Sequence, residues 1–268
     1  MSAESSLSSG IAVNDLDPKV RPQDDLYRHV NGAWIDRTEI PSDKARYGSF
    51  MVLAEEAEEA VRDIIIESQS AQPGTEERKV GDLYASFLDE ARADELGATP
   101  IAAQLADAAA VDSISTLLST LGRLERGGTS GFFQLFVDND PGNPERYLVF
   151  LEQGGLGLPD ESYYRDEKFA DVLSKYGTFI ERMLTLAGLD APAARAARIV
   201  ALETEIASKH WDNVANRDSE KTYNPMTWQA ANDLAGAVDL SVWLDAIDVP
   251  AHAFDEVVVR QPSFAQGL

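Results

Sequence analysis

The chain has 268 residues, 44% of them hydrophobic and 8% aromatic, so it is long and apolar enough to bury a sizeable core. Asp and Glu number 46 against 23 Lys and Arg, and the net charge of -23 argues against nucleic acid or an anionic membrane as a partner. The absence of cysteine excludes disulfide bonds, thiolate metal sites and cysteine nucleophiles.

Residues 1–22 are predicted to be a flexible segment, because they contain Pro18 and Pro22 and few large apolar side chains. The start is Ser-rich and carries Glu4, unlike a secretory signal peptide, and no later stretch approaches the ~20 apolar residues that span a bilayer. The default expectation is a cytoplasmic protein, with export by another route left open. Residues 23–268 are expected to form one helical domain, incomplete at its carboxyl end.

Apolar side chains at helical spacing predict a series of helices in the first half of the chain. The first is short and ends before Pro41, and the second is long and amphipathic, with an apolar stripe that starts at Phe50. Thr75 is expected to cap the third helix, and two more are predicted over residues 100–109 and 113–125. In the third helix, the side chains expected to face inward are Val80, Leu83, Tyr84, Phe87 and Leu88.

The pattern then changes to strands. Aromatic and β-branched runs over residues 132–137 and 147–151 predict a β-hairpin with a polar loop at residues 138–144. A glycine-rich connector, residues 154–159, follows the hairpin. The fold class expected from these elements is mainly α, with several helices and one small β-hairpin.

Helical spacing resumes after the connector, over residues 169–186 and 191–210, with Pro192 in the first turn of the second helix. Residues 226–235 and 240–247 are predicted to be short helices, and residues 257–259 a brief extended piece. Residues 261–268 show no completed element, which suggests a chain that stops before its fold does.

The three histidines do not form a zinc-binding motif. A zincin-type hydrolase holds its metal with two histidines one helical turn apart and a nearby carboxylate. His29, His210 and His252 are far apart in the sequence, and structural or surface roles are predicted for them. The sequence therefore predicts no catalytic residue and no metal ligand within this chain.

Other candidate sites have ordinary structural interpretations. The glycine-rich connector lacks both phosphate-loop spacings, so a turn is the better interpretation. Paired carboxylates such as Glu55 and Glu56 suit a carboxylate-based hydrolase, but in so acidic a chain such pairs arise by composition. The hairpin loop lacks EF-hand spacing, although it offers calcium the oxygen donors Asp138, Asn139, Asp140 and Asn143.

Five sequence blocks carry a family resemblance. They are DDLYRHVNGAW at 24–34, IPSDKARYGSF at 40–50, LYASFLD at 83–89, GLGLPDESYY at 155–164 and KTYNPMT at 221–227. In order and spacing they resemble the neprilysin and endothelin-converting-enzyme family of zinc metallopeptidases. Several blocks in order are more specific than one short motif, and the resemblance covers nearly the whole chain from about residue 22.

The resemblance implies the amino-terminal portion of such an enzyme. It implies a multi-helical cap domain, truncated before the thermolysin-like catalytic domain, that helps to enclose a cavity for peptide substrates. The zinc ligands of the family lie further toward the carboxyl terminus, so zinc is expected in the missing catalytic partner domain and not in this chain. The lack of cysteines suits a bacterial-type, intracellular relative.

Two residues acquire a substrate-binding role from the resemblance. Arg46 matches the family arginine that pairs with a carboxylate at the carboxyl-terminal side of a bound peptide, and a guanidinium grips a carboxylate with two hydrogen bonds. Phe50 matches an aromatic residue that lines the cavity. The alternatives are a surface ion pair for Arg46 and a core position for Phe50. Ala54 stands where some members have a second arginine, so the grip is expected to be weaker or differently built.

Two functions remain open at this point. The first is the amino-terminal part of a zinc metalloendopeptidase that hydrolyses small peptides, in which this chain alone is inactive. The alternative is a non-catalytic helical module that binds a peptide or a protein. Loss of the interface with the missing half predicts exposed apolar surface on the isolated chain.

Overall fold

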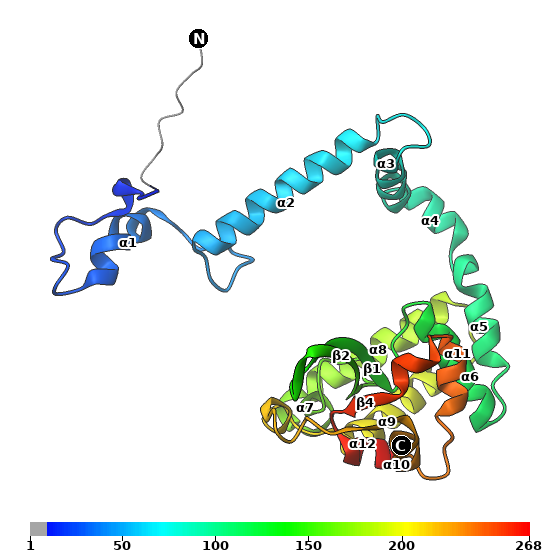
Figure 1. Ribbon diagram of the computed structural model, residues 1–268. Helices are drawn as coiled ribbons and strands as arrows, with labels where there is room; N and C mark the ends of the chain where they lie inside the picture. Colours follow the sequence, from blue (N-terminus) through cyan, green and yellow to red (C-terminus); the bar gives the residue numbers. More distant parts are fainter. Residues whose placement is uncertain (1–9) are drawn as a thin grey trace. The chain divides into compact units, whose positions relative to one another are not determined.

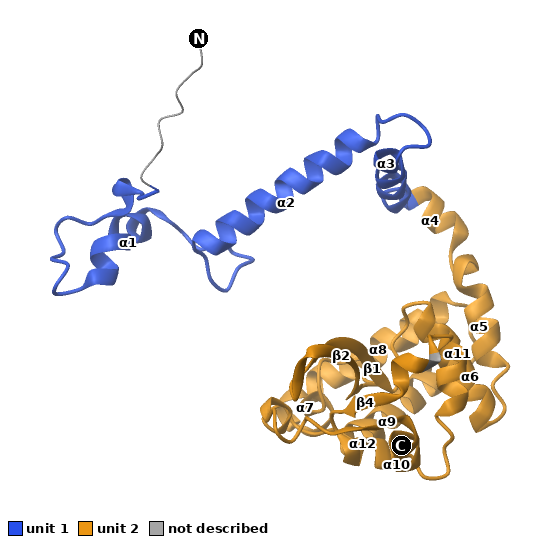
Figure 2. Cartoon of the chain, in the orientation of Figure 1, with its two compact units in different colours: residues 1–90 blue, residues 91–268 orange. Residues whose placement is uncertain are grey.

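The computed structural model describes residues 10–268, which divide into two compact units between residues 90 and 91 (Figure 1, Figure 2). Helices dominate both, and a four-stranded sheet belongs to the second. The predicted mainly helical class is therefore confirmed. The predicted division of the chain into a flexible segment at 1–22 and a helical domain at 23–268 is not tested by these two units and stays a prediction. Residues 1–9 of that segment lie outside the described part.

The first unit consists of helices joined by loops. Asp25 caps its first long helix by accepting a hydrogen bond from the Arg28 amide at 2.8 Å. Thr75 accepts from the Arg78 amide at 3.2 Å, which confirms the predicted cap. The elements are η1 (Val13–Asp15), α1 (Leu26–Arg37), α2 (Ser49–Ser68) and α3 (Glu76–Phe87).

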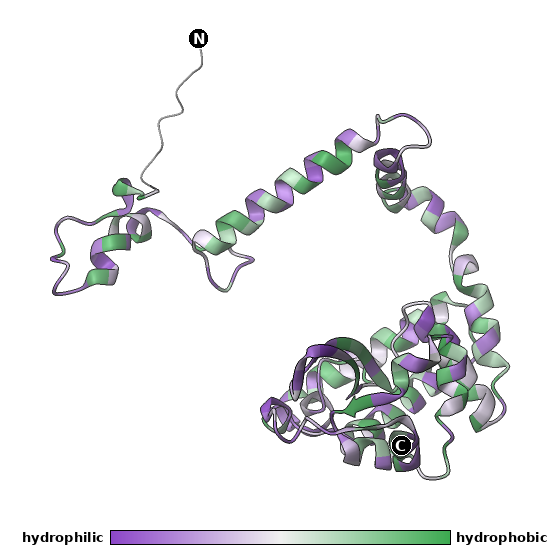
Figure 3. Cartoon of the chain, viewed as in Figure 1, coloured by the Kyte–Doolittle hydropathy of each residue, from purple (hydrophilic) through white to green (hydrophobic). Residues whose placement is uncertain are grey.

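The apolar side chains of α2 and α3 lie at the surface of the structure, and Figure 3 shows hydrophobic segments along α2. Leu83 is 72% exposed and Phe87 83% exposed, so the prediction that the apolar face of α3 points inward is wrong. The two helices meet at Gly81, where an added Cβ would lie 2.6 Å from the Gln69 backbone nitrogen. This contact, between Gly81 and the backbone of Ser68 and Gln69, brings the backbones close but covers little apolar surface, which leaves the larger side chains outside it.

The helices of the second unit match most of the predicted ones. Ser113 caps α6 with a capping box, and Pro192 occupies the first turn of α9, as expected. The α-helices absent from the predicted ones are α4, which has no apolar stripe, and the short α7 and α12. The helices are α4 (Glu90–Leu96), η2 (Thr99–Ile101), α5 (Ala102–Ala109), α6 (Ile114–Arg126), α7 (Ser162–Arg165), η3 (Glu167–Phe169), α8 (Ala170–Leu186), α9 (Pro192–Lys209), η4 (Ala215–Arg217), α10 (Trp228–Leu234), α11 (Ser241–Ile247), η5 (Ala251–Phe254) and α12 (Pro262–Gly267).

The sheet has the strand order β1-β2-β4-β3. The predicted hairpin is confirmed: β1 (Phe133–Asp140) pairs antiparallel with β2 (Asn143–Gln153). The predicted extended piece is β4 (Glu256–Val259), which lies parallel to β2. The edge strand β3 (Pro225–Thr227) was predicted to begin a helix, but its residues pair antiparallel with β4, and the helix starts only at Trp228. Sheet pairing with a strand distant in sequence overrides the local pattern there.

The predicted polar loop at 138–144 is shorter than expected, because both strands continue into it. The Asp140 side chain is 1% exposed and accepts hydrogen bonds from Tyr223 Oη at 2.5 Å, the Gly142 amide at 2.8 Å and Arg146 Nε at 2.7 Å. These contacts lower the pKa of Asp140, the Tyr223 hydroxyl having the largest effect. A carboxylate occupied by three donors supports a structural role and not the calcium site considered above.

The main core lies between the sheet and helices from distant parts of the second unit. Phe264 of α12 is fully buried and meets Phe133 edge to face, with ring centroids 5.7 Å apart. The expectation that residues 261–268 form no completed element is therefore wrong, because burial of this side chain fixes a short helix. Other fully or nearly fully buried core residues are Leu118, Leu151, Ala231, Leu240, Trp243, Val257 and Val259.

Candidate functional site

The loop that joins α1 to α2 carries both predicted substrate-binding residues. Arg46 lies at the end of the loop and Phe50 in the first turn of α2, and both line a hollow of about 400 Å³ formed by residues 46–51. Phe50 is 87% exposed, so its alternative interpretation as a core aromatic does not hold in the described structure. The hollow combines a cationic group with an aromatic ring, which suits a peptide end.

The guanidinium of Arg46 is exposed, and among residues 10–268 no carboxylate lies within 4.0 Å of it. The alternative of a surface ion pair is thus not observed in the described part of the chain. Arg46 is chemically able to bind an incoming carboxylate with two parallel hydrogen bonds. Its role in substrate binding stays a prediction.

A single carboxylate on α2 holds the loop next to Arg46. Glu55 accepts a hydrogen bond from Tyr47 Oη to its Oε2 at 2.9 Å, and its Oε1 lies 3.3 Å from Lys44 Nζ. The hydrogen bond to Glu55 raises the pKa of both Lys44 and Tyr47. In the sequence Glu55 is one of many acidic residues, and nothing in the one-dimensional pattern links it to the loop.

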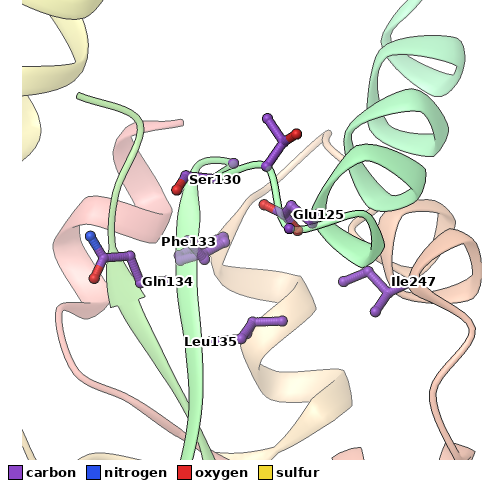
Figure 4. Close-up of a pocket in the computed structure, with 9 residues that line it drawn as sticks. Glu125, Ser130, Phe133, Gln134, Leu135 and Ile247 are labelled. Carbon is purple, nitrogen blue, oxygen red and sulfur yellow. The ribbon is translucent and has the colours of Figure 1, made fainter. Parts of the chain in front are cut away.

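A second hollow, of about 430 Å³, lies in the second unit and contains a partly buried carboxylate (Figure 4). Glu125, at the end of α6, accepts a hydrogen bond from Trp243 Nε1 to its Oε2 at 2.5 Å. Its Oε1 is buried and has no hydrogen-bond partner within the described residues. Burial raises the pKa of Glu125 to about 7, against its ordinary value of 4.5.

The buried oxygen of Glu125 is covered by the loop that follows α6. A Cβ added to Gly131 would lie 1.5 Å from Glu125 Oε1, so this oxygen packs against the loop backbone. A ligand in the hollow would have to displace the loop to reach it. We therefore assign Glu125 a role in the stability of the second unit and not in substrate binding.

The histidines have structural or surface positions, as predicted. His29 Nδ1 lies 2.7 Å from the Val20 carbonyl oxygen, and His210 Nε2 lies 2.9 Å from the Gly154 carbonyl oxygen. Burial lowers the pKa of His210, and His252 is exposed. Residues 10–268 contain no group of three or more His, Cys, Asp or Glu side chains arranged to hold a metal ion.

The glycine-rich connector is a turn, as expected. Gly155 has a φ of +84°, and the Gly157 amide donates to Glu203 Oε2 at 3.3 Å. The same carboxylate accepts from the hydroxyls of Tyr164 and Tyr176 at 2.5 and 2.9 Å. The connector is therefore held by a carboxylate from α9.

In the described part of the chain, no helix has the length and apolar character needed to cross a membrane.

Comparison with known proteins places these features in context. The sequence model of Peptidase family M13 (Peptidase_M13_N) matches residues 22–268. The inhibitor complex of the zinc metalloprotease Zmp1 of Mycobacterium tuberculosis is similar in structure, with a TM-score of 0.82 and 42% identity over 97% of this chain and 40% of that chain. PepO of Lactobacillus rhamnosis, at 22% identity and a TM-score of 0.72, supports the fold alone.

Curated animal proteins are also similar in sequence. Endothelin-converting enzyme-like 1 of Rattus norvegicus is 31% identical over 261 residues, which is 91% of this chain and 34% of the relative. Endothelin-converting enzyme 1 of Homo sapiens is 28% identical over 92% of this chain and 33% of the relative. The chain thus spans about a third of the length of these relatives.

Proposed function

This chain belongs to peptidase family M13, and from that premise we propose that it forms the amino-terminal part of a zinc metalloendopeptidase that hydrolyses small peptides. In this proposal its helices provide the lid and part of the wall of the substrate cavity. The observation that carries the proposal is the match of nearly the whole chain, at 42% identity, to a zinc metalloprotease of which it covers 40%.

Among residues 10–268, no group of three or more potential ligand side chains is arranged to hold zinc. His29 and His210 each have a ring nitrogen next to a backbone carbonyl oxygen, and the three histidines are distributed over the sequence. We therefore propose that zinc and the groups that activate its water belong to a catalytic domain outside these 268 residues. Bound there, zinc would polarise the peptide carbonyl and activate water. This chain's contribution is to bind and orient the peptide.

Arg46 and Phe50 are the residues proposed to bind the peptide. The exposed guanidinium next to an aromatic ring offers a carboxylate partner and an apolar contact in one hollow. Because Ala54 follows on the same helix instead of a second arginine, Arg46 would act without help from that position.

The 268-residue chain, purified free of other proteins, is expected to show no zinc-dependent peptide cleavage. The reason is that the described residues supply no metal-binding group. Quenched fluorescent peptides with added zinc, with and without a chelator, provide the measurement. Activity that disappears with the chelator would contradict the assignment of catalysis to another domain, and activity that survives it would favour the carboxylate-based hydrolase.

Replacing Arg46 with alanine is expected to remove a preference for peptides with a free carboxyl terminus. A charge-assisted, two-point hydrogen bond contributes enough that its loss should raise KM for the free acid by roughly tenfold. The measurement compares free-acid and amidated forms of one peptide in the zinc peptidase that carries this sequence. Arg62→Ala, which alters an exposed arginine on α2, is the matched control. An unchanged ratio of the two KM values in Arg46→Ala would rule out this role.

The second function we propose is a non-catalytic helical module that binds peptides or proteins. The exposed apolar side chains of α2 and α3 suit a binding surface of such a module, as they suit an interface with a catalytic domain. The two proposals differ in the genomic sequence after codon 268. A reading frame that continues into a helix with a His-Glu-x-x-His motif supports the peptidase, whereas a stop codon supports the module.

A further inference from the structure

Glu55 lies on α2, a helix of 20 residues, and contacts the preceding loop through both carboxylate oxygens. Its partners, Lys44 and Tyr47, come two residues before and one residue after Arg46. The loop backbone is therefore tied to the helix on both sides of this arginine. The two side-chain partners are about a third exposed or less, and so is Glu55 itself.

We propose that Glu55 is a positioning residue, which holds the loop so that Arg46 presents its guanidinium to the carboxylate of a peptide. This inference rests on the proposed substrate-binding role of Arg46. Glu55 does not touch the peptide. Its effect is exerted through Lys44 and Tyr47.

The backbone next to Arg46 is restrained at both ends. The Lys44 amide donates to the Pro41 carbonyl oxygen at 2.9 Å, and the Gly48 carbonyl oxygen accepts from the Met51 and Val52 amides at 2.9 and 3.0 Å, where α2 begins. Glu55 adds side-chain contacts between these two anchored points. A loop fixed before binding loses less conformational entropy when the ligand arrives, which increases affinity.

The same contacts keep Glu55 from neutralising Arg46. A free carboxylate on the first turns of α2 would compete with a peptide for the guanidinium. Lys44 and Tyr47 occupy both oxygens of Glu55, and in the described part of the chain Arg46 has no carboxylate within 4.0 Å. Glu55 thus restrains the loop while leaving the arginine available.

Limited proteolysis of the 268-residue chain tests the restraint directly. Trypsin cuts after Lys44 and Arg46, and a loop released from α2 should enter the protease more readily. Glu55→Gln is expected to increase the cleavage rate at these two bonds by roughly two- to fivefold, the range of a partly exposed ion pair. Glu59→Gln, which removes the same charge from an exposed position one turn later, should leave the rate unchanged. Equal rates in the two variants would overturn the inference.

Peptide recognition tests whether the restraint matters for binding. In the zinc peptidase that carries this sequence, Glu55→Gln is expected to raise KM for a free-acid peptide by roughly two- to fivefold. The kcat of the enzyme, and KM for the amidated peptide, should stay unchanged. Tyr47→Phe, which removes one of the two contacts, should produce a smaller increase, and Glu59→Gln none.

The outcomes separate this inference from the function on which it rests. If Arg46→Ala changes the acid-to-amide KM ratio and Glu55→Gln does not, the positioning role is wrong while the substrate-binding role of Arg46 stands. If neither variant changes the ratio, both roles are wrong. A fall in kcat for both peptides in Glu55→Gln would indicate a general structural defect and would also reject the positioning role.

Discussion

Replacing Phe264 with alanine is expected to lower the free energy of unfolding of the second unit by about 3–5 kcal/mol. Phe264 is fully buried and contacts two other rings, Phe133 at 5.7 Å and His210 at 4.8 Å between centroids. Its removal would lose the free energy gained when the ring moves from water into the core, and it would leave a cavity under α12. Unfolding by guanidinium chloride, followed by tryptophan fluorescence, measures the change, because Trp211, Trp228 and Trp243 lie in this unit.

The matched control for this prediction is Phe179→Ala on α8, where the ring is 56% exposed. The control should lower the free energy of unfolding by less than about 1 kcal/mol. A similar small effect for Phe264→Ala would contradict the assignment of α12 to the core. It would restore the expectation that the last residues of the chain form no completed element.

Replacing Glu125 with glutamine is expected to stabilise the second unit above pH 7 by up to about 3 kcal/mol, and to have no effect near pH 4.5. The folded state raises the pKa of Glu125 to about 7 from 4.5. The folded state therefore binds the proton more tightly than the unfolded state does. In the unchanged protein this destabilisation is absent below pH 4.5, grows as the pH rises from 4.5 to 7, and is complete above pH 7.

Glutamine reproduces the protonated carboxyl group, since it is uncharged and its oxygen can still accept from Trp243 Nε1. The free energy of unfolding should be measured by chemical denaturation at several pH values between 4.5 and 8. Glu181→Gln, at an exposed position on α8, removes the same charge and should follow the pH dependence of the unchanged protein. Parallel pH profiles for Glu125→Gln and the unchanged protein would refute a buried, destabilising charge.

Most helices could be predicted from the sequence because their signals are local. Thr75 and Ser113 cap helices by accepting from the amide three residues later, and Pro192 suits a first turn through the φ angle that its own ring fixes. The β-hairpin is also local, since its strands are adjacent in the sequence. By contrast, β3 needs β4 as a partner about 30 residues later, and α12 needs a core assembled from distant segments.

The candidate site was predictable only in part. Arg46 and Phe50 came from a resemblance to known proteins, and their roles stay predictions. Glu55 and Glu125 were missed because neither belongs to a motif: one is distinguished by contacts across a loop and the other by burial. Burial and contacts between elements are properties of the folded chain, and no spacing rule reports them.

The sequence by itself determined the family, the helical class and the position of most helices, because these depend on side chains close together in the chain. The tertiary structure decided which apolar side chains are covered: Leu83 and Phe87 of α3 are exposed, whereas Phe264 of α12 is buried. It also decided which of the 46 acidic residues have shifted pKa values, Glu125 and Asp140 among them. The physical reason is that hydrophobic burial and carboxylate pKa depend on all neighbouring atoms, most of which come from residues far away in the sequence.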